Sequence, residues 1–245
     1  LSVQQAGTLA RDMQKVDQYV IYQSIGRDAG WLTAAGALAK RAEDDPPHLV
    51  YLPERPFHRE RFLADAQAAQ ERFGYVSIVC GEGLKYADGT PVSASRTRDG
   101  FANVEYGAMG GASVGLNLHR MISEAFGWRG EFQITESLPM SAIDRAVQRD
   151  LDEAYACGRE AVRLAAAGTG GVMVTLAAAE GPDAPCTLGT APLHEVAVRA
   201  KPMPDEMINE AGNFPTRAFL DYAGPLVGPL PEFARLQGAP VARGD

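Results

Sequence analysis

The feature that most constrains the fold is the alternation of strand-like and helix-like segments in the first 80 residues. Apolar runs with strand character cover residues 19–25, 48–52 and 75–80. Helical patterns cover residues 3–15, 30–42 and 59–73, and the last of these carries Phe62, Ala66 and Ala69 on one stripe. Strands that alternate with helices favour a parallel sheet flanked by helices. We therefore predict an α/β fold, arranged as a three-layer sandwich.

The remaining sequence predicts further elements without a convincing interdomain linker. Residues 81–111 are rich in Gly, Ser, Thr and Asp and lack periodicity, so we interpret them as a loop. Helices are expected at 113–126, 142–167, 204–211 and 216–222, strands at 131–135 and 171–177, and a Pro/Gly-containing connection at 182–192. Because the Gly/Pro-rich stretches are short, we expect one continuous unit.

Composition excludes several classes of protein. The 245 residues are 46% hydrophobic and 22% charged, which is typical of a globular chain, and the formal net charge of −8 argues against binding to nucleic acid. No apolar run is long enough to cross a membrane, and three cysteines without CxxC spacing indicate neither a disulfide framework nor a zinc site. The expected location is the cytoplasm.

A glycine–arginine turn follows the first expected strand. The string SIGRDAGWLTAAGALAK covers residues 24–40, so the strand ends near Ile25 and a helix starts near Gly30. At the carboxyl edge of a parallel sheet, glycine allows close approach of a ligand, exposed N–H groups favour anions, and Arg27 can form paired hydrogen bonds with a phosphate. A tight turn that carries a solvated arginine fits the same pattern.

A carboxylate follows the third expected strand at the same edge of the sheet. The strand YVSIVC leads into Gly81, Glu82 and Gly83, which places a glutamate between two glycines. Glu82 could accept hydrogen bonds from the hydroxyl groups of a sugar. An exposed glutamate in a turn fits this pattern as well.

Together these strings resemble the phosphofructokinase family. Ile25-Gly26-Arg27 matches the family's Met-Gly-Arg sugar-phosphate motif, and Glu82-Gly83 matches its Glu-Gly pair. The string HLVYLPERPFHRERFLAD at 48–65 looks like the family's long, pyrophosphate-dependent bacterial branch. Residues 152–176 and 219–236 are also similar to that branch.

The resemblance implies a phosphoryl transfer from pyrophosphate to the 1-hydroxyl of fructose 6-phosphate, with magnesium as cofactor. Ile25, Gly26, Arg27 and Glu82 are then expected to bind the sugar phosphate, and Arg27 is also expected to act in catalysis by holding charge near the reacting phosphoryl group. Residues 1–138 would form the sugar-phosphate-binding domain, while residues 139–245 would pack back on the domains. A homo-oligomer or a catalytic partner chain is expected, because relatives build their sites across subunit contacts.

Two strings of the family do not occur in these 245 residues. In relatives, a Gly-Gly-Asp loop that holds the phosphoryl donor and a Thr-Ile-Asp-Asn-Asp segment with the catalytic base precede the matching part. The donor-binding domain is therefore expected to be largely absent, with the magnesium ligands outside this chain. Loss of a general base costs about 10²–10⁴-fold in rate, so we expect this chain alone to be inactive.

Substitutions at expected cationic positions leave three interpretations open. The family's Gln-Arg pair aligns with Pro139-Met140, where Arg145 or Arg149 could compensate, and Gln18 stands where an arginine often reaches a neighbouring subunit's site. The chain is then part of a longer enzyme, a subunit that needs a partner, or a degenerate, regulatory paralogue. Other classes lack their motifs: no G-x-G-x-x-G string follows a strand, and no G-x-S-x-G elbow is present.

Overall fold

The computed structural model describes residues 1–93, 113–135, 138–177, 186–197 and 200–234. The strands are β1 (Tyr19–Ser24), β2 (Leu49–Tyr51), β3 (Val76–Gly81), β4 (Gly130–Ile134), β5 (Val172–Ala177) and β6 (Thr187–Pro192). The α-helices are α1 (Ser2–Asp12), α2 (Trp31–Ala35), α3 (Arg59–Phe73), α4 (Val114–Phe126), α5 (Leu138–Ser141), α6 (Gln148–Ala166), α7 (Leu193–Val196) and α8 (Arg217–Val227). Short 3₁₀ turns cover Gly36–Ala39, Ile143–Arg145 and Asp205–Met207.

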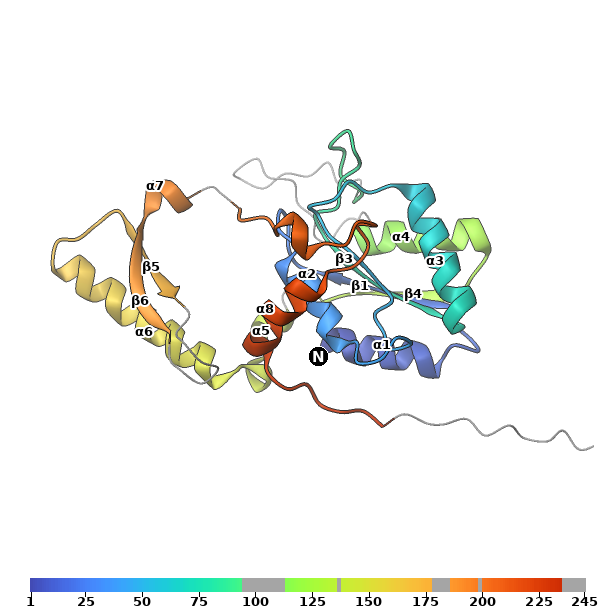
Figure 1. The fold of residues 1–245 in the computed structure, drawn as a ribbon, viewed down its shortest axis with the longest axis horizontal. Helices are drawn as coiled ribbons and strands as arrows, with labels where there is room; N and C mark the ends of the chain where they lie inside the picture. Colours follow the sequence, from blue (N-terminus) through green and yellow to red (C-terminus); the bar gives the residue numbers. More distant parts are fainter. Residues whose placement is uncertain (94–112, 136–137, 178–185, 198–199, 235–245) are drawn as a thin grey trace, which may run out of the picture.

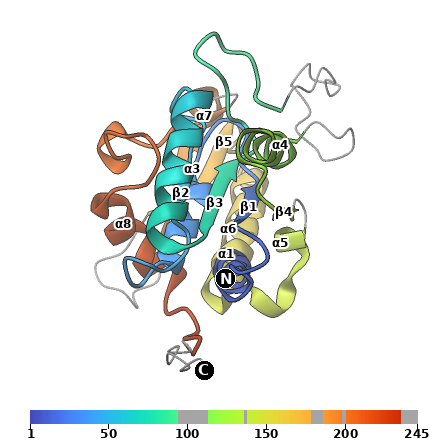
Figure 2. The ribbon, with the colours of Figure 1, turned by 90° about the vertical axis from the view of Figure 1, so that its right-hand side faces the viewer.

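The main body is a four-stranded parallel sheet with the order β2-β3-β1-β4, which Figure 2 shows from the side. The two central strands pair in register from Tyr19 opposite Val76 to Ser24 opposite Gly81. Because all four strands are parallel, their carboxyl ends meet at one edge of the sheet. The predicted parallel α/β sheet flanked by helices is therefore confirmed.

Helices cover both faces of this sheet. On one face, α3 and α4 bury Phe62, Leu118 and Ile122 against the strands. On the other face, α1, α2 and α8 contribute Val3, Ala34 and Phe219 to a second core. Figure 1 shows α4 above the strands and α1 below them. Apolar burial of this kind, worth roughly 25 cal/mol per Å², is the main force that holds the three layers together.

The elements of the main body follow the sequence patterns closely, with two corrections. The helix α3 begins and ends where its apolar stripe predicts, and Gly74, with φ of +81°, ends it in the left-handed conformation. The helix expected at 30–42 is shorter, because α2 changes into a 3₁₀ turn at Gly36 and regular structure ends at Ala39. The helix expected at 204–211 is wrong, since only Asp205–Met207 forms a 3₁₀ turn.

A second unit, made of α6, β5, β6 and α7, lies apart from the sheet at the left of Figure 1. In it, β5 pairs with β6 in an antiparallel hairpin, and α6 packs on β5. The strand β6 corrects the interpretation of residues 182–192 as a connection. Its glycine, Gly189, faces Thr175 on β5, where an added Cβ would meet the threonine hydroxyl at 3.0 Å.

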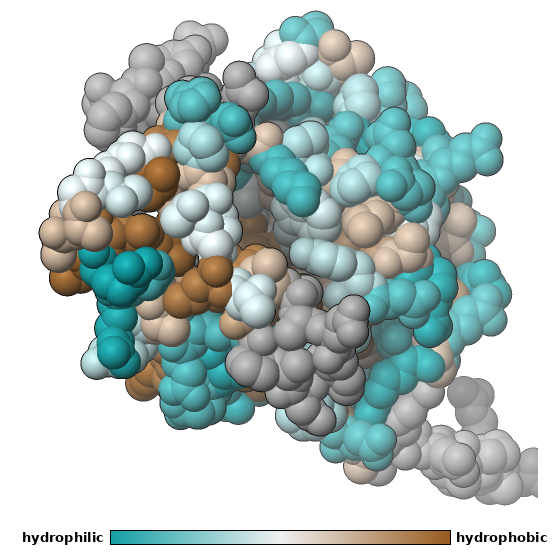
Figure 3. Space-filling model, turned by 60° about the vertical axis from the view of Figure 1, so that its left-hand side comes forward, coloured by the Kyte–Doolittle hydropathy of each residue, from teal (hydrophilic) through white to brown (hydrophobic). Residues whose placement is uncertain are grey.

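Large apolar side chains remain exposed on this second unit. On α6, Tyr155 is 71% exposed and Val162 is 70% exposed, and no residue of α6 is buried. Figure 3 shows apolar side chains gathered on this side of the molecule. Exposed apolar groups at this density are typical of surfaces that contact other polypeptide. The boundary expected between the sugar-phosphate-binding domain (residues 1–138) and the carboxy-terminal part (residues 139–245) stays a prediction.

After the second unit, the chain returns to the main body. Met203, Ile208, Phe219 and Ala223 are all buried in the core on the α1 and α2 face. We call residues 200–227 the return segment. Among the helices of the part of the chain that the structure describes, none is both long enough and apolar enough to cross a membrane.

Candidate functional site

The loop between β1 and α2 holds the predicted sugar-phosphate motif. Strand β1 ends at Ser24, and Gly26 has φ of +139°, a conformation that strongly favours glycine. The Gly26 amide donates a hydrogen bond to Oε1 of Glu82 at 3.2 Å. Arg27 is half-buried. The motif therefore lies at the carboxyl edge of the sheet, where the connection rules place it.

The turn after β3 packs directly against this loop. The Glu82 amide donates to the Ser24 carbonyl at 3.1 Å, which continues the pairing of β1 and β3 beyond the strand ends. At Gly83, an added Cβ would lie 1.6 Å from the carbonyl oxygen of Arg27. Only glycine allows the two backbones to approach this closely. The structure thus brings the Arg27 loop and the Glu82 turn together, as the sequence predicted.

One expectation about this loop needs refinement, and one residue beside it was missed. The Gly26 amide was expected to be a donor to the ligand, but the Glu82 carboxylate occupies it. A further cation, Lys85, lies beside the loop, with its Nζ 3.5 Å from Oδ1 of Asp28. Sequence reasoning missed Lys85, although it stands only three positions after the Glu82 candidate.

A third carboxylate fixes the far end of the loop. Glu54, which follows β2, accepts hydrogen bonds at Oε1 from the Gly30 amide at 2.7 Å and from the Met203 amide at 3.0 Å. Its Oε2 atom is buried and has no hydrogen-bond partner among the described residues. Sequence reasoning missed Glu54 as well, because its partners lie 24 and 149 positions away.

The Pro139-Met140 pair lies close to the Ile25-Gly26-Arg27 motif but adds no charged side chain there. A cavity of about 230 Å³ has both Ile25 and Pro139 in its lining. Met140, in α5, is 71% exposed. Of the two arginines that could compensate, Arg145 forms an ion pair with Asp144 at 3.1 Å, and Arg149 pairs with Glu153 at 2.9 Å.

Gln18 lies far from this edge of the sheet. It precedes β1, and its Oε1 accepts a hydrogen bond from the Arg129 amide at 3.0 Å, which ties β1 to the start of β4. Since Arg27 follows the carboxyl end of β1, the two positions stand at opposite ends of the same strand. Within one chain, Gln18 therefore serves the sheet and not the Arg27 loop.

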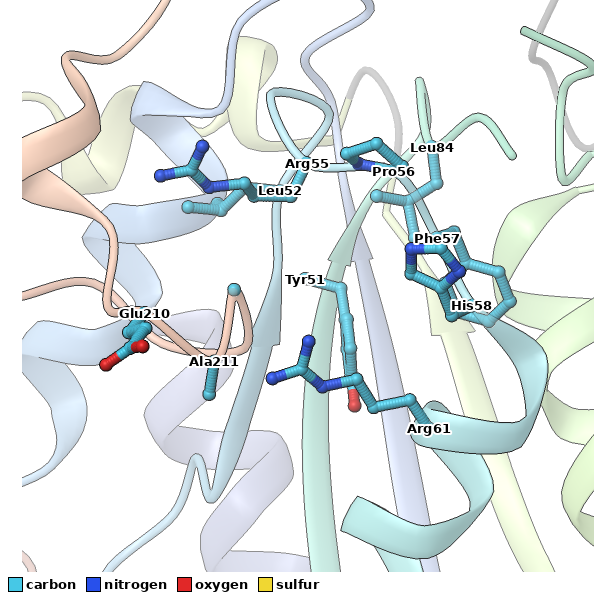
Figure 4. Close-up of a pocket in the computed structure, with 11 residues that line it drawn as sticks. Tyr51, Leu52, Arg55, Pro56, Phe57, His58, Arg61, Leu84, Glu210 and Ala211 are labelled. Atoms are coloured by element: carbon cyan, nitrogen blue, oxygen red, sulfur yellow. The ribbon is translucent and has the colours of Figure 1, made fainter. Parts of the chain in front are cut away.

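A second cavity, of about 110 Å³, lies at the end of β2 between α3 and the turn at residues 210–212. Figure 4 shows Arg61 extending from α3 beside Tyr51. The Tyr51 hydroxyl donates to Asp65 at 2.8 Å, and burial together with this carboxylate raises the pKa of Tyr51. Arg55, at the rim, pairs with Asp205 at 3.0 Å. Asp65 also accepts a hydrogen bond from the Asn213 side chain at 2.8 Å, so these polar groups join β2, α3 and the return segment.

Two other side chains with reactive groups, Cys80 and His119, have structural roles. Cys80 is fully buried in β3, and burial raises the pKa of its thiol. His119 on α4 shares a hydrogen bond of 2.7 Å with the Tyr19 hydroxyl. Among the residues that the structure describes, no group of three His, Cys, Asp or Glu side chains could hold a metal ion.

The parallel sheet, with the Gly-Arg loop and the Glu-Gly turn in contact at its carboxyl edge, has the phosphofructokinase fold. Solved structures agree. The chain superposes on pyrophosphate-dependent phosphofructokinase from Marinobacter aquaeolei with a TM-score of 0.75 and 30% identity, covering 95% of this chain and 54% of that one. For the enzyme from Nitrosospira multiformis, the TM-score is 0.77 with 29% identity, over 98% of this chain and 55% of that one.

Sequence comparison leads to the same family. The chain is 36% identical to a pyrophosphate–fructose 6-phosphate 1-phosphotransferase of Halomonas elongata over 84% of its own length and 48% of that protein. No family model matches the chain. The recognition made from the sequence is confirmed: the chain is a relative of the pyrophosphate-dependent phosphofructokinases and is similar to their carboxy-terminal part. It spans about half the length of the curated relatives it matches.

Proposed function

We propose that this chain supplies the sugar-phosphate-binding side of a phosphoryl transfer from pyrophosphate to the 1-hydroxyl of fructose 6-phosphate. The observation that carries the proposal is the contact between the two motif loops. The Arg27 carbonyl packs against Gly83, and the Gly26 amide binds the Glu82 carboxylate. A guanidinium and a carboxylate on adjoining backbones suit a phosphorylated ketose, which presents both an anion and hydroxyl groups.

Each residue has a role that its chemistry supports. Arg27 binds the phosphate charge through its fork of N–H donors, and Lys85, which pairs with Asp28, adds a second cationic group beside the loop. Glu82 holds the Gly26 amide through Oε1, and its carboxylate is the group that accepts hydrogen bonds from sugar hydroxyls in this proposal. The catalytic base, the donor site and the magnesium ligands belong, by the resemblance, to sequence outside this chain.

The alternative proposal is a non-catalytic regulatory or partner subunit. One observation favours it: Pro139 lines the same cavity as Ile25, where the resemblance expects a Gln-Arg pair. A neutral side chain there removes one cationic contact to the substrate. The lost contact weakens binding by about 1.5–3 kcal/mol.

Calorimetric titration with fructose 6-phosphate tests the binding proposal. The wild-type chain is expected to bind, and Arg27→Ala is expected to lose at least about tenfold in affinity, because one charge-assisted contact is removed. Arg120→Ala, at an exposed position on α4, is the matched control and should bind as the wild type does. Equal affinity of the Arg27→Ala variant would refute the proposed site.

A turnover assay separates the enzyme from the regulatory subunit. The chain is joined in one polypeptide to the preceding half of the Halomonas elongata relative and supplied with pyrophosphate, magnesium and fructose 6-phosphate. Pyrophosphate-dependent product formation that Arg27→Ala abolishes is the expected result. A folded fusion that binds the sugar phosphate but shows no turnover supports the regulatory role instead.

A further inference from the structure

Glu54 connects three parts of the chain that lie far apart in sequence. It follows β2, and its Oε1 atom accepts two backbone hydrogen bonds, from Gly30 at the end of the β1–α2 loop and from Met203 in the return segment. A carboxylate that accepts N–H donors forms stronger hydrogen bonds than a neutral acceptor does. Glu54 therefore holds the end of the loop against the return segment.

The side chain of Glu54 is closely packed against Gly30. An added Cβ on Gly30 would meet Oε2 of Glu54 at 2.7 Å and Leu52 at 2.9 Å. Oε2 is buried without a partner among the described residues. No ligand fits between Gly30 and Oε2. The Glu54 carboxylate therefore binds the backbone amides of Gly30 and Met203 and does not contact the substrate.

The first residue of α2, which directly follows the loop, contacts the same segment. The Trp31 indole N–H donates to the Lys201 carbonyl at 2.7 Å, and the Lys201 ammonium lies 6.0 Å from the centre of the Trp31 ring. The ring also lies 5.5 Å from Tyr222 and 6.3 Å from Phe219, both in α8. The carboxyl end of the loop is thus attached to the return segment by both polar and aromatic contacts.

We infer that Glu54 is a positioning residue for the sugar-phosphate loop, which it holds at Gly30 while Glu82 holds it at Gly26. Arg27 lies between these two fixed amides, so the position of its guanidinium depends on both carboxylates. A loop held in its binding conformation before the ligand arrives does not have to be ordered on binding. The inference rests on the proposed function of Arg27 and adds a residue that does not itself touch the substrate.

The experiment compares two substitutions at Glu54 in the full chain. Glu54→Ala removes both hydrogen bonds, whereas Glu54→Gln keeps one oxygen that can accept from Gly30 and Met203. Glu60→Gln, at an exposed position on α3, is the control. Three quantities are measured for each protein: the fructose 6-phosphate dissociation constant, the amide hydrogen exchange of residues 25–30 and 203, and the thermal midpoint.

The expected order of affinity is wild type, then Glu54→Gln, then Glu54→Ala, with at least about a tenfold loss in the alanine variant. Exchange at residues 25–30 should rise in the same order, while Leu118 in the core and the Glu60→Gln control stay unchanged. Partial rescue by glutamine separates a positioning role from a general loss of stability. A lower thermal midpoint with unchanged affinity and unchanged exchange at residues 25–30 would overturn the inference.

The two proposals fail in different ways. If the wild-type chain binds no fructose 6-phosphate, the proposed function is wrong, and hydrogen exchange alone decides on Glu54. Faster exchange at Gly26 and Arg27 in Glu54→Ala then still supports its action on the loop, and unchanged exchange refutes it. If the alanine variant does not fold, the glutamine variant decides by the same measurements.

Discussion

At the scale of single residues, the candidate site depends on how closely two backbones approach each other. Gly83 lies against the carbonyl of Arg27, and Gly26 donates its amide to Glu82. Neither contact involves the end of the Arg27 side chain. Substitutions at the glycines therefore test the geometry of the site without removing its charged groups.

Gly83→Ala is the first such substitution. Its Cβ would lie 1.6 Å from the Arg27 oxygen, so the two loops must move apart. We expect a loss of about 1–3 kcal/mol in the free energy of unfolding, as overpacking usually causes, together with weaker fructose 6-phosphate binding. Urea unfolding and calorimetry measure the two effects. Gly158→Ala, where an added Cβ meets nothing within 4 Å, is the control, and equal behaviour of the two variants would contradict the packing argument.

A buried histidine at the opposite edge of the sheet makes stability depend on pH. His48 is 9% exposed and stacks on Phe73, and its Nδ1 accepts a hydrogen bond from the Ser77 amide at 3.0 Å. Burial, followed by the nearby Lys40 ammonium, lowers the pKa of His48 from 6.5 to about 4. The folded protein therefore keeps this imidazole neutral at a pH where the unfolded chain protonates it.

The sign of the effect follows from the direction of this pKa shift. Stability is fully present above pH 6.5 and falls as the pH drops from 6.5 towards 4, because the unfolded chain binds the extra proton. A shift of this size corresponds to about 3 kcal/mol. Urea unfolding between pH 7 and pH 4.5 should show the decline, and His48→Gln should reduce its slope. His58→Gln, at an exposed histidine, should leave the slope unchanged; a pH-independent wild type would contradict the prediction.

At the scale of elements, the sequence predicts those parts of the fold whose apolar spacing is regular. The stripe on α3 gives that helix its bounds, and the apolar runs of β1 and β3 mark the two central strands. Strand β6 was missed because the segment TLGTAP has neither alternation nor β-branched continuity, and its strand conformation depends on pairing with β5. Local pattern cannot show such pairing.

The candidate site was predictable for a related reason. Parallel connections place the ends of β1 and β3 at one edge of the sheet, so the nearness of Arg27 and Glu82 follows from the order of elements alone. Glu54 and Met203 come together only because the return segment folds onto the α2 face. No spacing in the sequence indicates a contact across 149 positions, and such contacts had to be seen in the structure.

At the scale of the whole molecule, the chain consists of a well-packed sheet and a second unit that lies apart from it. The core residues of the main body are almost fully buried, whereas α6 buries none of its residues. The stability of the molecule is therefore concentrated in the main body. The second unit has a hairpin and one helix, which is little structure from which to build a core of its own.

The exposed apolar side chains of α6 lead to a prediction about assembly. Tyr155 and Val162 expose most of their surface to water, and covering them in a contact between chains would be favourable. We expect at least a dimer at micromolar concentration, measured by light scattering. Replacing both residues by glutamate should shift the population towards single chains, because a charge at a buried contact is costly. Val16→Glu, at an exposed position outside the second unit, is the control, and a wild-type chain with the mass of one molecule throughout this range would contradict the prediction.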